Sequence, residues 1–239
     1  MLFHLGDNKM KYVGSKNKLS KELLPIINSF RKPDQTYVEP FVGGANLIDK
    51  IKGKRIAGDT HKELISMWKA LQDGWVPPKI VSEQEYKAIR YGDYPDYLKG
   101  YVGFNLSFGG KWWGGYARYT SPQGVVQPFG LQAYKFVTEQ IENIKGIEFH
   151  NLPYSELPIP NKSLIYCDPP YKNTLKYKHT INHEDFYGWC RDKTSEGHTV
   201  LLSEFSAPKD FKCIFAKERS VSLALDGGKS NVERLFVLT

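Results

Sequence analysis

Short apolar runs and amphipathic stretches alternate along most of the chain. Apolar runs typical of buried strands lie at residues 36–38, 55–58, 147–149, 164–167 and 198–203. Apolar residues with helical spacing lie between these runs, at residues 19–27, 64–71, 134–144 and 186–190. The alternation predicts an α/β fold with a mostly parallel sheet. Further apolar runs at 213–215, 221–223 and 235–238, around a turn at 226–231, predict a C-terminal antiparallel hairpin.

The alternation stops between residues 72 and 134, which predicts an inserted domain between two parts of a catalytic domain, 1–71 and 135–239. No acidic residue lies between Asp96 and Glu139. Basic and aromatic residues stand there in a glycine-rich hairpin or loop, among them Lys111, Trp112, Trp113, Tyr116 and Arg118. Basic residues contact phosphates and aromatic residues stack on bases, so this pattern favours DNA binding. The alternative is an aromatic loop that packs on its own domain.

The composition is that of a globular protein with a polyanionic partner. Of its 239 residues, 41% are hydrophobic and 25% charged, and the formal net charge is +7. Three cysteines without C-x-x-C spacing argue against disulfides and zinc, and six histidines show no ligand spacing. No signal peptide or membrane span is predicted. We therefore expect a cytoplasmic protein that uses neither a membrane nor a metal.

The motif Asp168-Pro169-Pro170-Tyr171 follows the apolar run at 164–167 directly. Ligands bind at the carboxyl ends of strands in open α/β sheets. The prolines predict a stiff, extended turn with outward carbonyl groups. Asp168 and the Pro169 carbonyl can accept hydrogen bonds from an exocyclic amine while Tyr171 stacks on its ring. A proline turn in which Asp168 is only a cap is the alternative.

A Gly-Gly turn follows the first predicted strand, which ends at Glu39. Phe41 and Gly43 belong to this turn. Glycine lets the backbone come close to a ligand, and an acid at the strand end suits a ligand with a positive amino group. The chain then enters a short helix. The spacing is not G-x-G-x-x-G, so a nicotinamide cofactor is not predicted.

Asp59 ends the second predicted strand, about 20 residues after the first, where an acid can bind ribose hydroxyls. The pattern Thr60-x-x-Glu63 predicts a capping box for the next helix, so Asp59 could instead be only an N-cap. Tyr12 and Lys16 stand in a loop before the first helix, where a lysine could hold an anionic group.

The sequence Asn151-Leu152-Pro153-Tyr154 is a second motif of the same type as Asp168-Pro169-Pro170-Tyr171. It resembles the motif of ribosomal RNA adenine dimethyltransferases. We assign catalysis to Asp168 instead, because the strand before residue 151 is short and polar. Tyr154 is expected to line a cofactor pocket. Residues 172–183 are basic and polar, and they predict a mobile loop at the active site.

Taken in order, residues 11–16, residues 38–44, the strand ending in Asp59 and residues 166–171 resemble the motifs of Dam-type (D12 class) DNA adenine-N6 methyltransferases. The resemblance implies a Rossmann-like sheet that binds S-adenosyl-L-methionine, plus an inserted target-recognition domain. It implies that Tyr12 and Lys16 hold the cofactor, that Phe41 and Gly43 lie near its methionine part, and that Asp59 binds its ribose.

The same resemblance assigns catalysis to Asp168, Pro169, Pro170 and Tyr171, with Asp168 also facing the cofactor. Arg118 falls where the family places base-reading residues. The expected reaction is methyl transfer to N6 of a flipped adenine in double-stranded DNA, with GATC as the family's usual target. The expected setting is the nucleoid of a bacterial or phage-infected cell, and a restriction endonuclease is a candidate partner. An inert DNA-binding protein with this fold and an RNA adenine methyltransferase are the alternatives.

Overall fold

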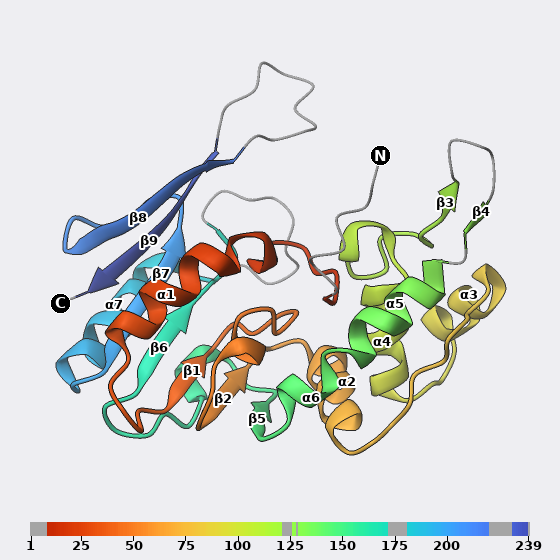
Figure 1. The fold of residues 1–239 in the computed structure, drawn as a ribbon, viewed down its shortest axis with the longest axis horizontal. Coiled ribbons are helices and arrows are strands. Elements are labelled where there is room, and N and C mark those ends of the chain that lie inside the picture. Colours follow the sequence, from red (N-terminus) through yellow and green to blue (C-terminus); the bar gives the residue numbers. More distant parts are fainter. Residues whose placement is uncertain (1–8, 121–125, 128, 172–180, 220–230, 239) are drawn as a thin grey trace.

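The fold is built around a sheet of seven strands in the order β5-β2-β1-β6-β7-β9-β8 (Figure 1). It is seen in a computed structural model that describes residues 9–120, 126–127, 129–171, 181–219 and 231–238. The strands are β1 (Tyr37–Glu39), β2 (Arg55–Gly58), β5 (Ile147–His150), β6 (Leu164–Cys167), β7 (Thr199–Glu204), β8 (Phe211–Arg219) and β9 (Asn231–Leu238).

Five strands of the sheet are parallel, and the last two are not. Strands β5, β2, β1, β6 and β7 pair parallel to one another. Strand β9 pairs antiparallel with β7, and β8 pairs antiparallel with β9. The expected mostly parallel sheet with a C-terminal antiparallel hairpin is thus confirmed. The apolar run at 221–223 and residues 226–230 of the expected turn lie outside the described residues.

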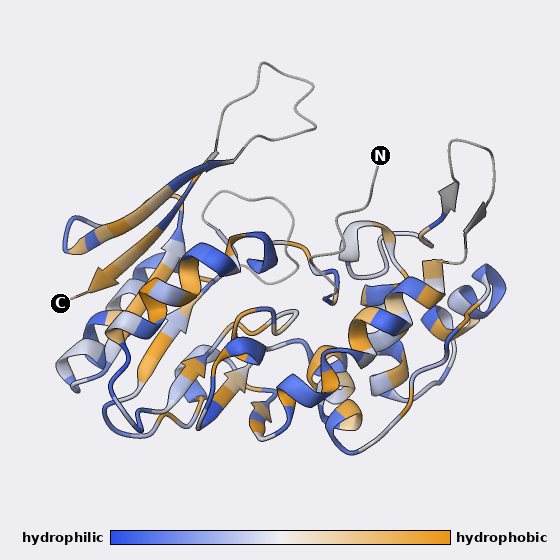
Figure 2. Cartoon of the chain, in the orientation of Figure 1, coloured by the Kyte–Doolittle hydropathy of each residue, from blue (hydrophilic) through white to orange (hydrophobic). Residues whose placement is uncertain are grey.

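Helices cover both faces of the sheet because successive side chains of a strand point to opposite faces. Helices α1 (Ser20–Phe30) and α2 (Lys62–Gln72) share one core with Tyr37 and Leu164. Helix α7 (His183–Ser195) shares the other core with Val38 and Ile165. Strands β6 and β9 carry hydrophobic colour along much of their length in Figure 2, as burial between two helical layers requires.

The start of α2 differs from the expected capping box at Thr60 and Glu63. The N-cap is His61, and no side chain caps the helix there. The Asp59 carboxylate instead accepts a hydrogen bond from the His61 N–H at 2.9 Å, so an acid one residue before Thr60 holds this end of the helix.

The turn after β1 leads into a short helix, as expected from the sequence. This helix is a single 3-10 turn, η2 (Ile48–Lys50).

Residues 72–134 are mainly helical. They contain α3 (Glu83–Tyr91), α4 (Asp96–Asn105), the start of α5 (Phe129–Thr138), η3 (Phe108–Gly110) and the strand pair β3 (Tyr119–Thr120) and β4 (Val126–Gln127). Helix α4 packs so closely on α2 that a Cβ at Gly100 would lie 2.1 Å from the Glu63 carbonyl oxygen. The segment is therefore joined firmly to the sheet through α2.

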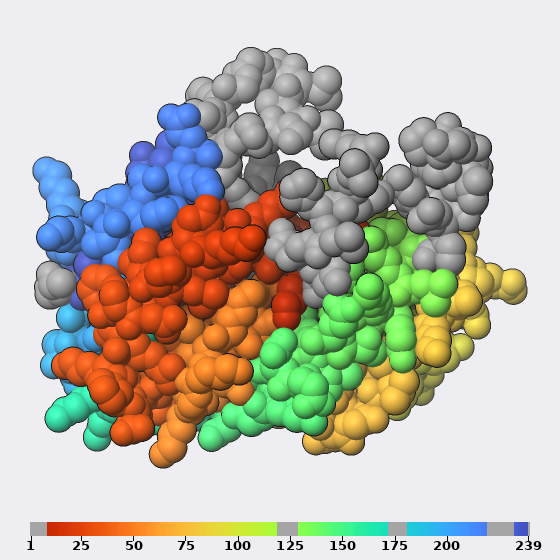
Figure 3. Space-filling view, viewed as in Figure 1, coloured from red at the N-terminus to blue at the C-terminus, as the bar shows by residue number. Residues whose placement is uncertain are grey.

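The single helix expected at 134–144 is two helices, α5 and α6 (Ile141–Ile144), with the expected boundary after residue 134 inside α5. The break falls at Gln140, whose side chain is fully buried. Arg55 then joins β2 to the end of α6, donating to the carbonyl oxygens of Asn143 at 2.7 Å and Lys145 at 2.6 Å. Figure 3 shows the resulting surface, on which the orange and green segments lie side by side.

Candidate active site

Acidic residues gather at the carboxyl edge of the sheet. Glu39 ends β1, Asp59 follows β2 and Asp168 follows β6, and these three strands are parallel neighbours. Antiparallel pairing places Glu233 of β9 at the same edge, because its neighbour Arg234 pairs with the last residue of β7. The structure thus brings together three acids expected from the sequence and adds a fourth.

Lys16 lies among these acids. Its ammonium nitrogen is 2.6 Å from Asp168 Oδ1 and 3.2 Å from Glu233 Oε1, and only 5% of its side chain is exposed. It also donates to the Gly14 carbonyl oxygen at 3.3 Å. The sequence predicted Lys16 as a cofactor residue, whereas in the structure it is the direct partner of the expected catalytic acid.

Tyr171 is held at the same cluster by its hydroxyl and its ring. The hydroxyl donates to Glu233 Oε1. The Lys16 ammonium lies 4.8 Å from the ring centroid, within the range of a cation–π contact. Phe205 packs edge-on at 4.6 Å between ring centroids. Burial and the neighbouring carboxylates raise the pKa of Tyr171 well above its ordinary value, so its hydroxyl stays protonated and donates.

The Asp168 carboxyl keeps 20% of its side chain exposed at this cluster. Burial raises its pKa, while the positive charge of Lys16 opposes the rise and the negative charge of Glu233 adds to it. The near ammonium group of Lys16 thus offsets part of the effect of burial on this acid. Pro169 beside it is buried and Pro170 is half-buried.

Glu39 is a buried acid next to this pair. Its Oε1 accepts a hydrogen bond from the Tyr37 hydroxyl at 2.8 Å, and 4% of the residue is exposed. Burial raises the pKa of Glu39 to about 8, and the nearby Asp168 charge adds to the rise. A buried carboxyl of this kind favours a positive group as a neighbour.

Gly43 is in the conformation that only glycine adopts easily, with φ of 47°. A Cβ at this position would lie 2.6 Å from Cε1 of Tyr12. The Gly43 N–H donates to Asp59 Oδ2 at 3.1 Å, and its carbonyl oxygen accepts from the Trp68 indole at 3.0 Å. The glycine turn therefore joins Tyr12 and Asp59, two expected cofactor residues, across one short backbone segment.

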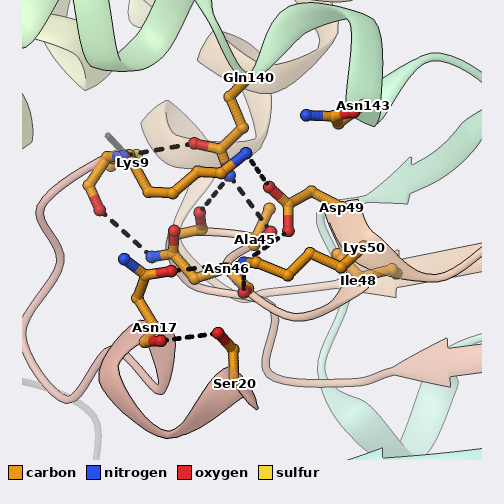
Figure 4. A network of polar contacts seen from close by, with 12 residues as sticks. Lys9, Asn17, Ser20, Ala45, Asn46, Ile48, Asp49, Lys50, Gln140 and Asn143 are labelled. Atoms are coloured by element: carbon orange, nitrogen blue, oxygen red, sulfur yellow. Dashed lines mark hydrogen bonds and ion pairs between the residues drawn. The ribbon is translucent and has the colours of Figure 1, made fainter. Parts of the chain in front are cut away.

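A buried polar network fixes this turn against the N-terminal segment (Figure 4). The Gln140 amide nitrogen donates to the carbonyl oxygens of Gly44 at 3.1 Å and Ala45 at 3.2 Å. Its oxygen accepts from the Met10 N–H at 3.3 Å, and Asn46 donates to the Met10 carbonyl at 3.2 Å. Buried hydrogen bonds between these groups favour one arrangement, so the network sets where the segment with Tyr12 and Lys16 lies. Among the described residues, the buried Asn46 Oδ1 has no hydrogen-bond partner.

Two lysines complete the network at Asp49, whose side chain is fully buried. Lys9 lies 2.7 Å from Asp49 Oδ2 and Lys50 lies 3.1 Å from Oδ1. Lys50 also donates to Asn17 at 3.3 Å, which ties η2 to η1 (Asn17–Leu19) beside Lys16. The signal for this network in the sequence is weak, because its members are far apart in the chain.

Phe41 and Tyr154, both expected at the cofactor, pack against each other. Their ring centroids are 5.6 Å apart, and Trp189 of α7 packs edge-on to Tyr154 at 5.1 Å. Asn151 donates to the Asp59 carbonyl oxygen at 3.0 Å, so the loop after β5 lies at the end of β2. Carboxyl groups, aromatic rings and a close glycine backbone together suit a ligand with an ammonium group, hydroxyls and a flat base.

The residues predicted for DNA binding lie in two different environments. The Trp112 ring centroid is 4.3 Å from that of His61, and Trp113 packs against Tyr86 at 5.0 Å. The Tyr116 hydroxyl donates to the Val81 carbonyl oxygen at 2.6 Å. Trp113 and Tyr116 thus pack within residues 72–134, the alternative that the sequence left open, whereas Trp112 packs on His61 at the start of α2.

The two basic residues of that set, Lys111 and Arg118, are exposed, and Arg118 pairs with Glu83. Contact of the aromatic loop with DNA remains a prediction for all five residues. Residues 172–180 of the loop expected at 172–183 lie outside the described residues.

Sequence reasoning missed Glu233 and Phe205. A signal for Glu233 existed, because it is in phase with Leu235 and Val237, which face one core of the sheet. An acid on the core face of a strand is unusual and points to a function or a buried ion pair. Phe205 follows β7 without any comparable signal.

The mixed α/β fold, with its mostly parallel seven-stranded sheet and antiparallel last pair, is consistent with an S-adenosylmethionine-dependent methyltransferase fold. Residues 12–101 match the family model of the D12 class N6 adenine-specific DNA methyltransferases. This match agrees with the resemblance drawn from the motifs: residues 12–101 are similar to the D12 class N6 adenine-specific DNA methyltransferases.

A curated protein of similar sequence is a modification methylase. The chain is 26% identical over 192 residues, 68% of its own length, to the modification methylase StsI of Streptococcus sanguinis. It spans only 28% of the length of that curated relative.

The part of the chain that the structure describes holds no cluster of three or more potential metal ligands. Within those same residues, every helix is too short or too polar to cross a membrane.

Proposed function

We propose that the protein is a site-specific DNA methyltransferase that moves a methyl group from S-adenosylmethionine to N6 of an adenine in duplex DNA. The observation that carries the proposal is the Asp168 carboxyl at the end of β6, inside a Pro-Pro-Tyr turn and balanced by Lys16. The match of residues 12–101 to the adenine-specific family supports it.

We assign the cofactor to the surface formed by the glycine turn and the ends of β1 and β2. Glu39 supplies a buried carboxyl toward an ammonium group, and Asp59 supplies an acceptor for ribose hydroxyls. Tyr12, Lys16, Phe41, Gly43 and Tyr154 complete this surface. The bound cofactor supplies an electrophilic methyl group on a sulfonium.

Asp168 and the Pro169 carbonyl would accept hydrogen bonds from the adenine amine and so orient its nitrogen toward the bound cofactor. Positioning of this kind supplies much of the acceleration in a two-reactant step. Asp168 does not remove a proton first, because a carboxylate is far too weak a base for a neutral aromatic amine. It would stabilise the positive charge that develops on nitrogen. When the methyl group has passed to nitrogen and the sulfonium is left as a neutral thioether, the now acidic N–H proton would go to solvent.

Adenine N6 lies inside the base stack, so the base must leave the duplex before transfer. The unstacking free energy of a few kcal/mol is offset by stacking on Tyr171 and by phosphate contacts of the insert. We assign residues 72–134 as the target-recognition domain and residues 1–71 and 135–239 as the catalytic domain. GATC is the first target sequence to test.

The decisive experiment is sequencing of N6-methyladenine in the DNA of methylation-deficient bacteria that express the protein. We expect methylation at one short sequence, with none for Asp168→Ala and normal levels for Asp192→Ala, an exposed acid on α7. Unmodified DNA from cells containing the folded wild-type protein would refute the proposal.

Methyl transfer to structured RNA instead of duplex DNA would favour the RNA methyltransferase alternative. Absence of S-adenosylmethionine binding in calorimetry would favour an inert DNA-binding protein. Cell fractionation tests the proposed location at the nucleoid in the cytoplasm, and co-purification tests a restriction endonuclease partner.

A further inference from the structure

Glu233 lies outside every motif discussed above, yet it contacts two residues of the Asp168 cluster. Its side chain is 2% exposed, its Oε1 is 3.2 Å from the Lys16 ammonium, and it accepts a hydrogen bond from the Tyr171 hydroxyl. Lys16 reaches Asp168 with the same nitrogen. One buried carboxylate therefore joins the stacking aromatic to the ammonium that balances the expected catalytic acid.

We propose that Glu233 is a positioning residue of the methyl-transfer site, which holds the Tyr171 ring and the Lys16 ammonium beside Asp168. The inference rests on the proposed function, since it assigns a role within that same site. Glu233 does not contact the substrate in this assignment. It acts through the two side chains that it orients.

The geometry favours this role over simple stabilisation of the fold. A charged acceptor makes shorter and stronger hydrogen bonds than a neutral one, so both partners are held firmly. The Tyr171 side chain is held by Glu233 at its hydroxyl, by a T-shaped contact with the Phe205 ring and by Lys16 over its own ring. A ring held in this way presents a stacking surface of fixed orientation.

Glu233 also changes the electrostatic environment of Asp168. Its negative charge raises the pKa of Asp168, whereas the Lys16 charge lowers it. The groups that face Asp168 are Lys16 before η1, Glu233 on β9, Tyr171 on its own turn, Glu39 on β1, and Tyr166 and Cys167 on β6. Removing one charge at a time therefore moves the Asp168 pKa in opposite directions for Glu233 and Lys16.

The test is the pH dependence of methyl transfer by the full chain, with a duplex that carries the sequence found methylated in cells. Glu233→Gln keeps an acceptor for Tyr171 but loses the charge. We expect the rate to fall about tenfold or more through lost positioning, and the acid limb of the profile to move to lower pH. Lys16→Met should move the acid limb to higher pH.

Two further variants separate positioning from folding. Glu233→Asp keeps the charge but draws it back from Tyr171 and Lys16, so we expect a slower rate with little movement of the acid limb. Glu218→Gln on β8, an exposed acid of the same hairpin, is the control, and we expect no change in rate or profile. Thermal unfolding shows whether each variant is folded.

A folded Glu233→Gln variant with wild-type rate and pH profile would overturn the inference while leaving the proposed function intact. Should Glu233→Gln fail to fold, a folded Glu233→Asp variant with the wild-type rate would overturn it equally. A wild-type protein that methylates no adenine would instead overturn the proposed function itself.

Discussion

The Tyr12 ring lies against Gly43 so closely that a single added carbon on Gly43 would come within 2.6 Å of it. The N-terminal segment and the turn after β1 thus form one surface, although the two residues are far apart in sequence. Asp59 is fixed to the same turn by the Gly43 N–H. Three of the expected cofactor residues therefore depend on one another for their positions.

The first prediction concerns this contact. Gly43→Ala should displace the Tyr12 ring and strain a backbone with φ of 47°, which costs about 1–2 kcal/mol of stability before the clash is counted. We expect S-adenosylmethionine to bind at least about tenfold more weakly, the equivalent of roughly 1.4 kcal/mol. Calorimetric titration and urea unfolding measure the two effects.

Gly146→Ala is the matched control, because Gly146 has φ of 73° and an added Cβ there would meet nothing within 4 Å. The Gly146→Ala variant should lose stability only through the strain of a positive φ, and it should bind the cofactor normally. Equal cofactor affinity in both variants would contradict a role for the Tyr12–Gly43 contact.

The second prediction concerns Asp59. Asp59→Ala removes the acceptor for the N–H groups of Gly43 and His61 as well as the proposed ribose acceptor. We expect the cofactor dissociation constant to rise, with a smaller effect on the rate at saturating cofactor. Asp73→Ala, an exposed acid just after α2, should bind normally. An unchanged dissociation constant for Asp59→Ala would remove this residue from the site.

The third prediction is a pH dependence of stability set by Glu39. Its pKa is about 8 in the folded protein, against 4.5 as its ordinary value. Between these two pH values the unfolded chain releases a proton that the folded protein keeps, so stability falls as pH rises. The slope contributed by this group is at most about 1.4 kcal/mol per pH unit.

Glu39→Gln removes that contribution, so its stability relative to the wild type should increase as pH rises from about 5 to 8. Urea unfolding across this range measures the difference. A constant difference between the two proteins at every pH would contradict the raised pKa.

The fourth prediction separates packing from DNA contact in the insert. Trp112 packs on α4, since a Cβ at Gly103 would lie 2.3 Å from its ring. Trp112→Ala should therefore destabilise the fold by about 2–3 kcal/mol, somewhat less than for a fully buried tryptophan. Unfolding experiments measure this loss directly.

Lys111 is exposed, so Lys111→Ala should change stability by less than about 0.5 kcal/mol. If it contacts a phosphate, DNA binding weakens and the salt dependence of binding falls by roughly 0.9 in slope. Fluorescence anisotropy at several salt concentrations measures both. Wild-type affinity and slope would exclude Lys111 from the DNA interface.

Local patterns in the chain were enough to place the catalytic edge. The apolar run at 164–167 predicts β6 with its observed bounds, and the acid after it must stand at the strand end. The same reasoning places Glu39 and Asp59, because parallel strands align their carboxyl ends. These features depend on residues that are neighbours in sequence, so periodicity and turn chemistry suffice.

Contacts between residues that are far apart in sequence could not be predicted from these local patterns. Lys16 and Asp168 are separated by 152 positions, and their contact exists only because β6 lies beside β1 and the N-terminal loop closes over that edge. The capping box expected at Thr60 is wrong, because the N-cap of α2 is the next residue, His61, whose N–H donates to Asp59. Antiparallel pairing of β9 with β7 brings Glu233 to the cluster. Periodicity places a residue on an element, but only packing between elements decides which charges share a site.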